Sequence, residues 1–187
     1  MEQARKLQKA DWIKAGLKAL GTRGSAALKA DILARQLGVS RGSFYWHFAD
    51  VAAFHRAVLA AWEEAAVDRP YASAMVKSSD DLTTNLRALV DRAFTSPVEL
   101  ELAVLSWGKT FAEAAVAAER VNARRFELLS SMFTRQGQDS KAARMRAYLL
   151  LSAYLGRMHL GAVHSLDDAE RGDLVALLTN GAQEAGR

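Results

Sequence analysis

A short run from Gly38 to Asp50 constrains the fold of this chain more than any other segment. It reads Gly-Val-Ser-Arg-Gly-Ser-Phe-Tyr-Trp-His-Phe-Ala-Asp. Glycine permits a sharp reversal of the chain, and Ser40 and Asp50 are residue types that favour the start of a helix. The run follows an apolar helical segment, residues 28–37, in which the small Ala34 allows a close helix crossing. The pattern predicts two short helices joined by a tight turn.

Two helices joined in this way are typical of a helix-turn-helix, whose second helix enters the major groove of DNA. That helix is expected to begin at Ser40, whose hydroxyl can accept a hydrogen bond from the amide of Ser43. Phe44 and Phe48 are predicted to be buried anchors. The residues before Phe44, and those between Phe44 and Phe48, are then expected to face the major groove.

Residues 7–62 resemble the N-terminal DNA-binding domain of the tetracycline-repressor (TetR) family of bacterial regulators. The resemblance rests on an amphipathic first helix, on Leu33-Ala34 leading into Leu37-Gly38-Val39-Ser40, and on the string Phe44-Tyr45-Trp46-His47-Phe48. It implies a ligand-responsive transcriptional regulator, most often a repressor. Such a protein binds a palindromic operator in double-stranded DNA as a homodimer and is released by a small-molecule effector.

The resemblance also implies the fold. We expect an all-α protein of about nine helices, in which a three-helix helix-turn-helix domain precedes a helical ligand-binding and dimerisation domain. Two prolines and abundant alanine and leucine independently favour a nearly all-helical chain. The expected domains are residues 1–49 and 50–187, with a helix over 50–67, capped by Asp50, connecting them. Breaks are predicted at 68–70 and 77–80, and helix starts are predicted at Ser96-Pro97-Val98-Glu99 and at the capping box of Asp167 and Glu170.

Eight residues are expected to contact DNA: Lys29, Ser40, Arg41, Gly42, Ser43, Tyr45, Trp46 and His47. Arg41 has two alternatives, since a guanidinium binds either a guanine edge or a phosphate. Tyr45 and His47 resemble positions that contact phosphate in the family. Trp46 either packs in the core or faces DNA.

Three positions depart from the family pattern. Lys29 replaces a threonine that opens the second helix, Asp31 replaces a basic residue, and Val51 stands near a position that often carries lysine. Arg5, Lys6 and Lys9 would compensate through an N-terminal arm. The departures motivate an alternative function, a helical ligand-sensing or protein-binding regulator whose DNA binding is weakened or lost.

Charge and composition favour DNA binding over catalysis. Residues 1–62 contain ten Lys and Arg against four acids, a net of +6, whereas the whole chain is +4 and the remainder therefore −2. A basic region of this kind is expected to meet a polyanion. The chain has no cysteine, no Gly-rich phosphate loop and no nucleophile elbow, and its four histidines lack metal-ligand spacing. We therefore expect no enzyme activity, metal or cofactor.

The location expected from the sequence is cytoplasmic. No signal peptide is visible, and the longest apolar stretch, residues 147–155, is too short to span a bilayer.

The second domain contains two sets of apolar residues. One set forms helical stripes that either build a dimer interface or pack on their own chain: Ala147, Leu151, Tyr154, Leu155, Leu174, Leu177 and Leu178. The other set, either cavity wall or ordinary core, is expected to line an effector pocket: Trp107, Phe111, Met132, Phe133, Met145, Tyr148, Met158 and His159.

Overall fold

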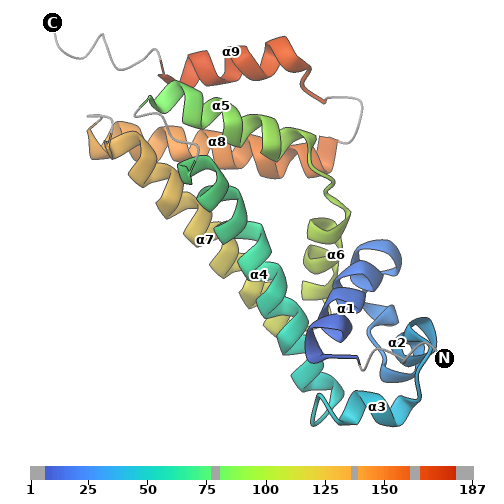
Figure 1. Cartoon of the computed structure of the whole chain (residues 1–187). Coiled ribbons are helices and arrows are strands. Elements are labelled where there is room, and N and C mark those ends of the chain that lie inside the picture. The colour runs from blue at the N-terminus through green and yellow to red at the C-terminus, as the bar shows by residue number, and fades with distance from the viewer. Residues whose placement is uncertain (1–6, 77–80, 136–138, 161–164, 180–187) are drawn as a thin grey trace, which may run out of the picture. The chain divides into compact units, whose positions relative to one another are not determined.

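The computed structural model describes residues 7–76, 81–135, 139–160 and 165–179. Figure 1 shows the helices of this part of the chain. The first four α-helices are α1 (Lys9–Arg23), α2 (Ala30–Leu37), α3 (Arg41–Tyr45) and α4 (Val51–Val76), with a 3-10 turn at Ser25–Ala27. The others are α5 (Leu82–Thr95), α6 (Glu99–Gly108), α7 (Ala112–Arg135), α8 (Ser140–Leu160) and α9 (Asp168–Thr179). The predicted all-α fold of about nine helices is confirmed.

The helices form two compact units. The head unit comprises residues 1–64 and 98–119, and the body unit comprises residues 65–97 and 120–187. Helices α4 and α7 each contribute to both units. The division at residues 49 and 50 stays a prediction about separately folding domains. Within the described residues, no helix is both long and apolar enough to cross a bilayer.

Aromatic side chains fill the centre of the head unit. The ring of Phe44 lies 5.3 Å from Trp12, 5.1 Å from Phe48 and 5.4 Å from Phe54, measured between centroids. All four rings are buried, so the predicted anchoring by Phe44 and Phe48 is confirmed. Gly16 makes this packing possible, because a Cβ there would lie 2.7 Å from the ring of Phe54.

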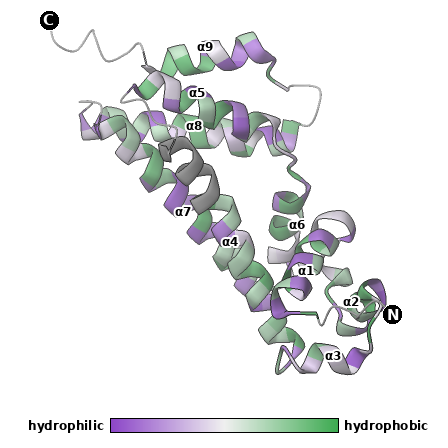
Figure 2. Ribbon diagram, viewed as in Figure 1, coloured by the Kyte–Doolittle hydropathy of each residue, from purple (hydrophilic) through white to green (hydrophobic). Residues whose placement is uncertain are grey.

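Helix α6 belongs to the head unit although it follows α5 in the chain. It packs on α1, and Figure 2 shows hydrophobic residues (green) along it. Its start differs from the prediction, because Val98 occupies the N-cap position whereas Ser96 ends α5. The carbonyl of Ser96 instead accepts a hydrogen bond from Arg157 of α8 at 2.7 Å. The side chain that was expected to cap α6 therefore belongs to the turn before it.

Helix α4 is longer than the predicted connector over residues 50–67. Its start is confirmed, because the Ala53 amide donates to the Asp50 carboxylate at 2.6 Å. The break predicted at residues 68–70 is wrong, since the helix continues past Pro70 to Val76. The break predicted at residues 77–80 lies outside the described residues. Proline inside a helix removes one main-chain hydrogen bond and crowds the preceding turn, so it can bend a long helix without ending it.

Arginine side chains join the helices of the body unit. Arg171 of α9 donates to the Asp91 carboxylate of α5 at 2.8 Å and to the Leu166 carbonyl at 2.8 Å. Arg87 bonds the same carboxylate at 2.8 Å and Asp168 at 2.5 Å. These bonds hold α9 on α5. The predicted capping box at the start of α9 is confirmed by reciprocal bonds of 2.8 and 2.9 Å between Asp167 and Glu170.

Candidate nucleic-acid interface

The turn between α2 and α3 depends on Gly38. Its φ of 70° and ψ of 29° lie in the left-handed region, which glycine adopts without a steric penalty. The amide of Val39 closes the turn by donating to the carbonyl of Ala34 at 3.0 Å. Ala34 is buried where α2 and α3 pack together, as its small size predicted. The predicted pair of helices with a tight turn is confirmed.

Ser40 precedes α3 but does not cap it through its side chain. Its backbone is extended, with φ −70° and ψ 151°, and its main-chain carbonyl accepts from the Ser43 amide at 3.0 Å. The predicted bond from that amide to the Ser40 hydroxyl is therefore wrong. The hydroxyl lies instead 3.7 Å from where a Cβ of Gly42 would stand. Ser40 and Gly42 are both exposed, and Ser43 is half-buried.

Arg41 and Tyr45 form a pair on the exposed side of α3. The Arg41 guanidinium donates to the Tyr45 hydroxyl at 3.2 Å and lies 5.8 Å from the centre of its ring. This hydrogen bond is the main cause that holds the pKa of Arg41 above its ordinary value. A fixed positive charge is therefore presented beside a phenol, both accessible to solvent.

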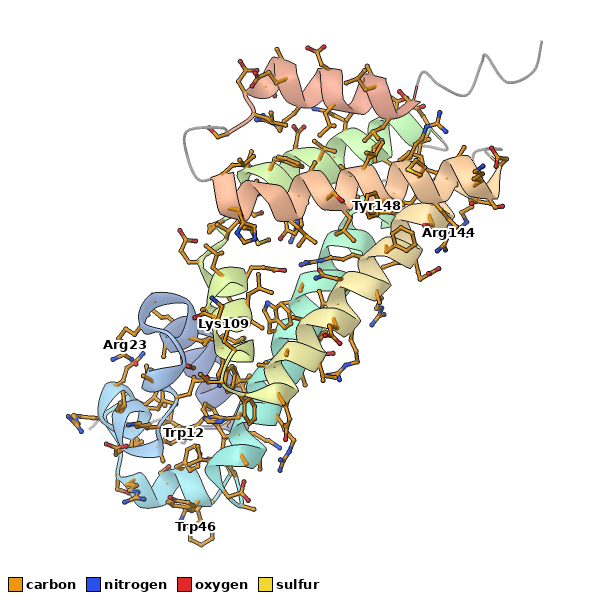
Figure 3. The ribbon with its side chains drawn as sticks, turned by 180° about the vertical axis from the view of Figure 1, so that it is seen from behind. Trp12, Arg23, Trp46, Lys109, Arg144 and Tyr148 are labelled. Carbon is orange, nitrogen blue, oxygen red and sulfur yellow. The ribbon has the colours of Figure 1, made fainter. Side chains whose placement is uncertain are left out.

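Trp46 extends from the end of α3 into solvent. Its side chain is 89% exposed, and Figure 3 shows it pointing away from the ribbon. The other tryptophans, Trp12, Trp62 and Trp107, are all buried. The alternative that Trp46 packs in the core is therefore wrong. Trp46 is thus a large apolar ring in solvent at the end of α3.

Lys29 and His47 lie at the two ends of this region. Lys29 is exposed at the N-cap position of α2 and makes no side-chain cap. His47 is half-buried, and its amide donates to the carbonyl of Phe44 at 3.0 Å. The acid at position 31 is partly neutralised, since the Asp31 carboxylate lies 3.6 Å from the Arg35 guanidinium. The local field at α2 is thus less negative than Asp31 alone would make it.

The expected N-terminal arm is described only in part. Arg5 and Lys6 lie outside the described residues, whereas Lys9 is exposed at the first position of α1. The Lys9 ammonium lies 5.4 Å from the centre of the Phe48 ring, close to the end of α3. Lys9 therefore places a cation from α1 beside the ring of a buried anchor that follows α3.

The eight residues expected to line one effector pocket are spread over both units. Trp107 and Phe111 stack in the head unit, with centroids 5.0 Å apart and an interplanar angle of 13°. In the body unit three are buried, namely Met132, Phe133 and Met158. Three others on α8 are exposed, namely Met145, Tyr148 and His159. These three side chains are in solvent in the single chain, and their place in an effector pocket stays a prediction.

Helix α8 is apolar on two faces, so its sequence pattern does not show which apolar residues are buried. The predicted dimer stripe is turned toward its own chain at Ala147, which is buried, and at Leu151, Tyr154 and Leu155, which are half-buried. On the other face Met145, Tyr148, Leu149 and Leu160 are exposed, Tyr148 at 61%. In α9, Leu178 is buried, Leu174 is half-buried and Leu177 is 78% exposed. The signal that sequence reasoning missed is that α8 has more apolar residues than one buried face can hold.

The helix-turn-helix segment matches a known protein family in sequence. Residues 13–58 match the family model described as bacterial regulatory proteins, tetR family. No curated protein sequence matches the chain.

Solved structures share the fold over nearly the whole chain. A protein from Pseudomonas aeruginosa PAO1, described as a transcriptional regulator, has a TM-score of 0.73 at 17% identity and covers 100% of this chain and 97% of its own. One from Mesorhizobium loti, described as a TetR-family transcriptional regulator, has a TM-score of 0.72 at 16% identity, with 99% and 98% covered. A regulator from Saccharomonospora viridis, described as being in complex with choline, has a TM-score of 0.68 at 17% identity, with 89% and 92% covered.

The matched segment spans most of α1, all of α2 and α3, and the start of α4, which together form the helix-turn-helix. Residues 13–58 thus match the model of the TetR family of bacterial regulatory proteins in sequence, and the full chain shares the fold of solved structures that include a TetR-family regulator.

Proposed function

We propose that the protein is a transcriptional repressor that binds a palindromic operator as a homodimer and leaves it when a small-molecule effector binds. The observation that carries this proposal is the exposed side of α3. A fixed guanidinium at Arg41, a phenol at Tyr45 that is 46% exposed and the indole of Trp46 stand together on a helix-turn-helix. Cations and exposed rings of this kind suit phosphates, base edges and the methyl group of thymine. The site of action that follows is DNA in the cytoplasm.

The eight residues divide by chemistry. We assign Arg41, with Ser43 beside it on α3, to the groove. Lys29 and Tyr45 supply a charge and a hydroxyl for phosphate, and His47 is placed to do the same. Exposed Ser40 and Gly42 allow the first turn of α3 to approach the duplex closely.

The dimer we propose forms through the outer face of α8 together with α9. That face presents Met145, Tyr148, Leu149 and Leu160, and α9 adds Leu177. A second copy of the chain would cover this surface through a two-fold axis, since the same residues then meet their own equivalents. Two copies of α3 would read two half-sites of a palindrome.

Effector release is supported by a related fold. The regulator from Saccharomonospora viridis is described as being in complex with choline, so a chain of this fold holds a small molecule. We place the effector of the present protein in its helical body, among buried residues such as Met132, Phe133 and Met158. Its binding would favour a dimer whose two copies of α3 no longer match the operator spacing.

The test starts from selection of duplexes out of a random-sequence pool by the purified full chain. We expect a palindrome to be recovered, with an affinity that falls steeply as salt rises. Because Trp46 is the exposed tryptophan, duplex binding should change its emission and reduce its quenching by iodide. The variant Trp46→Phe is the matched control, in which the emission change should disappear.

The double variant Arg41→Ala with Tyr45→Ala should lose the duplex while remaining a folded dimer. Unchanged binding by that variant would place the reading surface elsewhere. Recovery of no sequence above background would favour the alternative function, a regulator that senses a ligand or binds a protein with weakened DNA binding. Asp31 and the absence of lysine at Val51 are the features that motivate this alternative.

A further inference from the structure

A series of ring contacts leads from the DNA-facing helix into α4. Tyr45 lies edge-on to Phe44 with centroids 5.3 Å apart, and Phe44 lies 5.4 Å from Phe54. The next residue of α4 is His55, whose ring centroid is 6.2 Å from that of Phe54. Phe44 and Phe54 are buried, and rings packed in a protein interior do not move independently, while His55 is half-buried beside them.

The series continues from His55 to the corner between α6 and α7. The imidazole lies 5.0 Å from Trp107 at an interplanar angle of 89°, and 5.7 Å from Phe111 at 78°. Trp107 is near the end of α6, and Phe111 immediately precedes α7. All of these residues belong to the head unit.

His55 also holds the backbone just before α2. Its Nε2 lies 3.0 Å from the carbonyl oxygen of Leu28, a buried residue. The helical bonds of α2 begin one residue later, where the Leu33 amide donates to the Lys29 carbonyl at 3.0 Å. A carbonyl only accepts, so Nε2 carries the proton and His55 is the donor. The imidazole thus touches the α6–α7 corner and fixes the entry to the helix-turn-helix at the same time.

The corner itself has little room. A Cβ on Gly108 would lie 3.1 Å from the Cα of Ala115, so α6 and α7 approach each other at backbone distance. Any added atom must shift the corner by a few tenths of an ångström. Trp107, the residue before Gly108, would move with it against His55.

We propose that His55 is a positioning residue that transmits the placement of the α6–α7 corner to α2 and α3. Its ring edge follows Trp107 and Phe111, and its Nε2–H carries that movement to the Leu28 carbonyl. The consequence for DNA affinity rests on the proposed function, whereas the transmission is a property of the free protein. A hydrocarbon ring at position 55 would keep the packing but lose the hydrogen bond.

The experiment is a double-variant cycle with Gly108→Ala as the displacement and His55→Phe as the interruption, made in the full chain. Amide hydrogen exchange over residues 30–45 is measured for the four proteins. We expect Gly108→Ala to accelerate exchange there in the wild-type background. In the His55→Phe background, where exchange is already faster by roughly fivefold to tenfold for a lost hydrogen bond, Gly108→Ala should add nothing. If Gly108→Ala fails to fold, Phe111→Leu replaces it as the displacement.

Additive effects of the two substitutions would overturn the proposal, and so would an unchanged exchange in Gly108→Ala. Thr95→Val is the matched control, because it removes a side-chain hydrogen bond to a main-chain carbonyl in α5 of the body unit and should leave residues 30–45 unaffected. His55→Gln retains a donor and should restore part of the protection, which simple loss of packing would not predict. Affinity for the selected duplex should fall by about tenfold in His55→Phe. If no duplex is recovered at all, the proposed function fails while the exchange cycle still decides the role of His55.

Discussion

Different interactions join the helices within each of the two units. In the head unit, buried rings meet at 5.0 to 5.4 Å around Phe44. In the body unit, α9 is fastened to α5 by guanidinium–carboxylate bonds centred on Asp91. Apolar packing depends little on pH or salt, whereas ion pairs weaken when a partner is protonated or screened. We therefore expect the head unit to keep its shape under conditions that weaken the attachment of α9, which carries part of the proposed dimer face, to α5.

The largest effect is expected for Phe44→Ala. The substitution removes a buried ring that touches four others, and such changes cost about 3–5 kcal/mol of unfolding free energy. Chemical denaturation followed by circular dichroism measures the loss. Trp46→Ala is the matched control on the same helix turn, because that ring is in solvent and its removal should leave stability nearly unchanged. Equal losses in the two variants would contradict the description of the head.

A smaller effect is expected for Arg171→Met. The side chain is 12% exposed and bonds Asp91, Asp168 and the Leu166 carbonyl. Methionine keeps much of the volume, so the loss of charged hydrogen bonds, about 2 kcal/mol, dominates. Hydrogen exchange should rise in α9 and leave α1 to α3 unchanged. Arg35→Met removes an exposed ion pair of the head and should change neither unit.

The smallest effect is a pH dependence confined to the body unit. The Arg87 guanidinium, with Arg171 beside it, holds the pKa of the Asp91 carboxyl below its ordinary value. A lowered pKa in the folded state means that this stabilisation is present above the unfolded pKa of about 3.9. It is lost as pH falls through the lower, folded value.

Acid titration followed by exchange at α9 measures this dependence, and Asp91→Asn should remove it. A head unit that loosened first on acidification would reverse the comparison.

The helix-turn-helix could be predicted from sequence because its constraints are local. Gly38 must adopt a left-handed conformation, and Phe44 and Phe48 must be buried, one in α3 and one just after it, whereas Trp46 between them is in solvent. The exposed side that contains Arg41 and Tyr45 follows from the same geometry. Assignment of individual residues to bases or phosphates stays a prediction.

The sequence could not predict which face of α8 is buried. Leucine occupies three consecutive positions, Leu149 to Leu151, so the spacing of apolar residues does not single out one face. Which side is buried is decided by the helices of the chain that pack against it. For the same reason Met145 and Tyr148 were predicted to line a pocket, although both lie on the exposed face of α8. Two predictions from single residues were wrong, namely that the Ser40 hydroxyl caps α3 and that α4 ends before Pro70. In both places the main-chain hydrogen bonds of the helix outweighed the local preference of one residue.

The packing of α6 on α1 has a consequence for how such proteins can be cut and recombined. Gly21 of α1 lies where a Cβ would stand 3.5 Å from the backbone of Leu100, so α1 is fitted to a segment some eighty residues downstream. A fragment that stopped after the first part of α4 would expose that side of α1 to water. The helix-turn-helix part of the chain is therefore not a contiguous folding unit. In a chimera that exchanged only the first third of the chain with a relative, α1 of one protein would have to pack on α6 of the other.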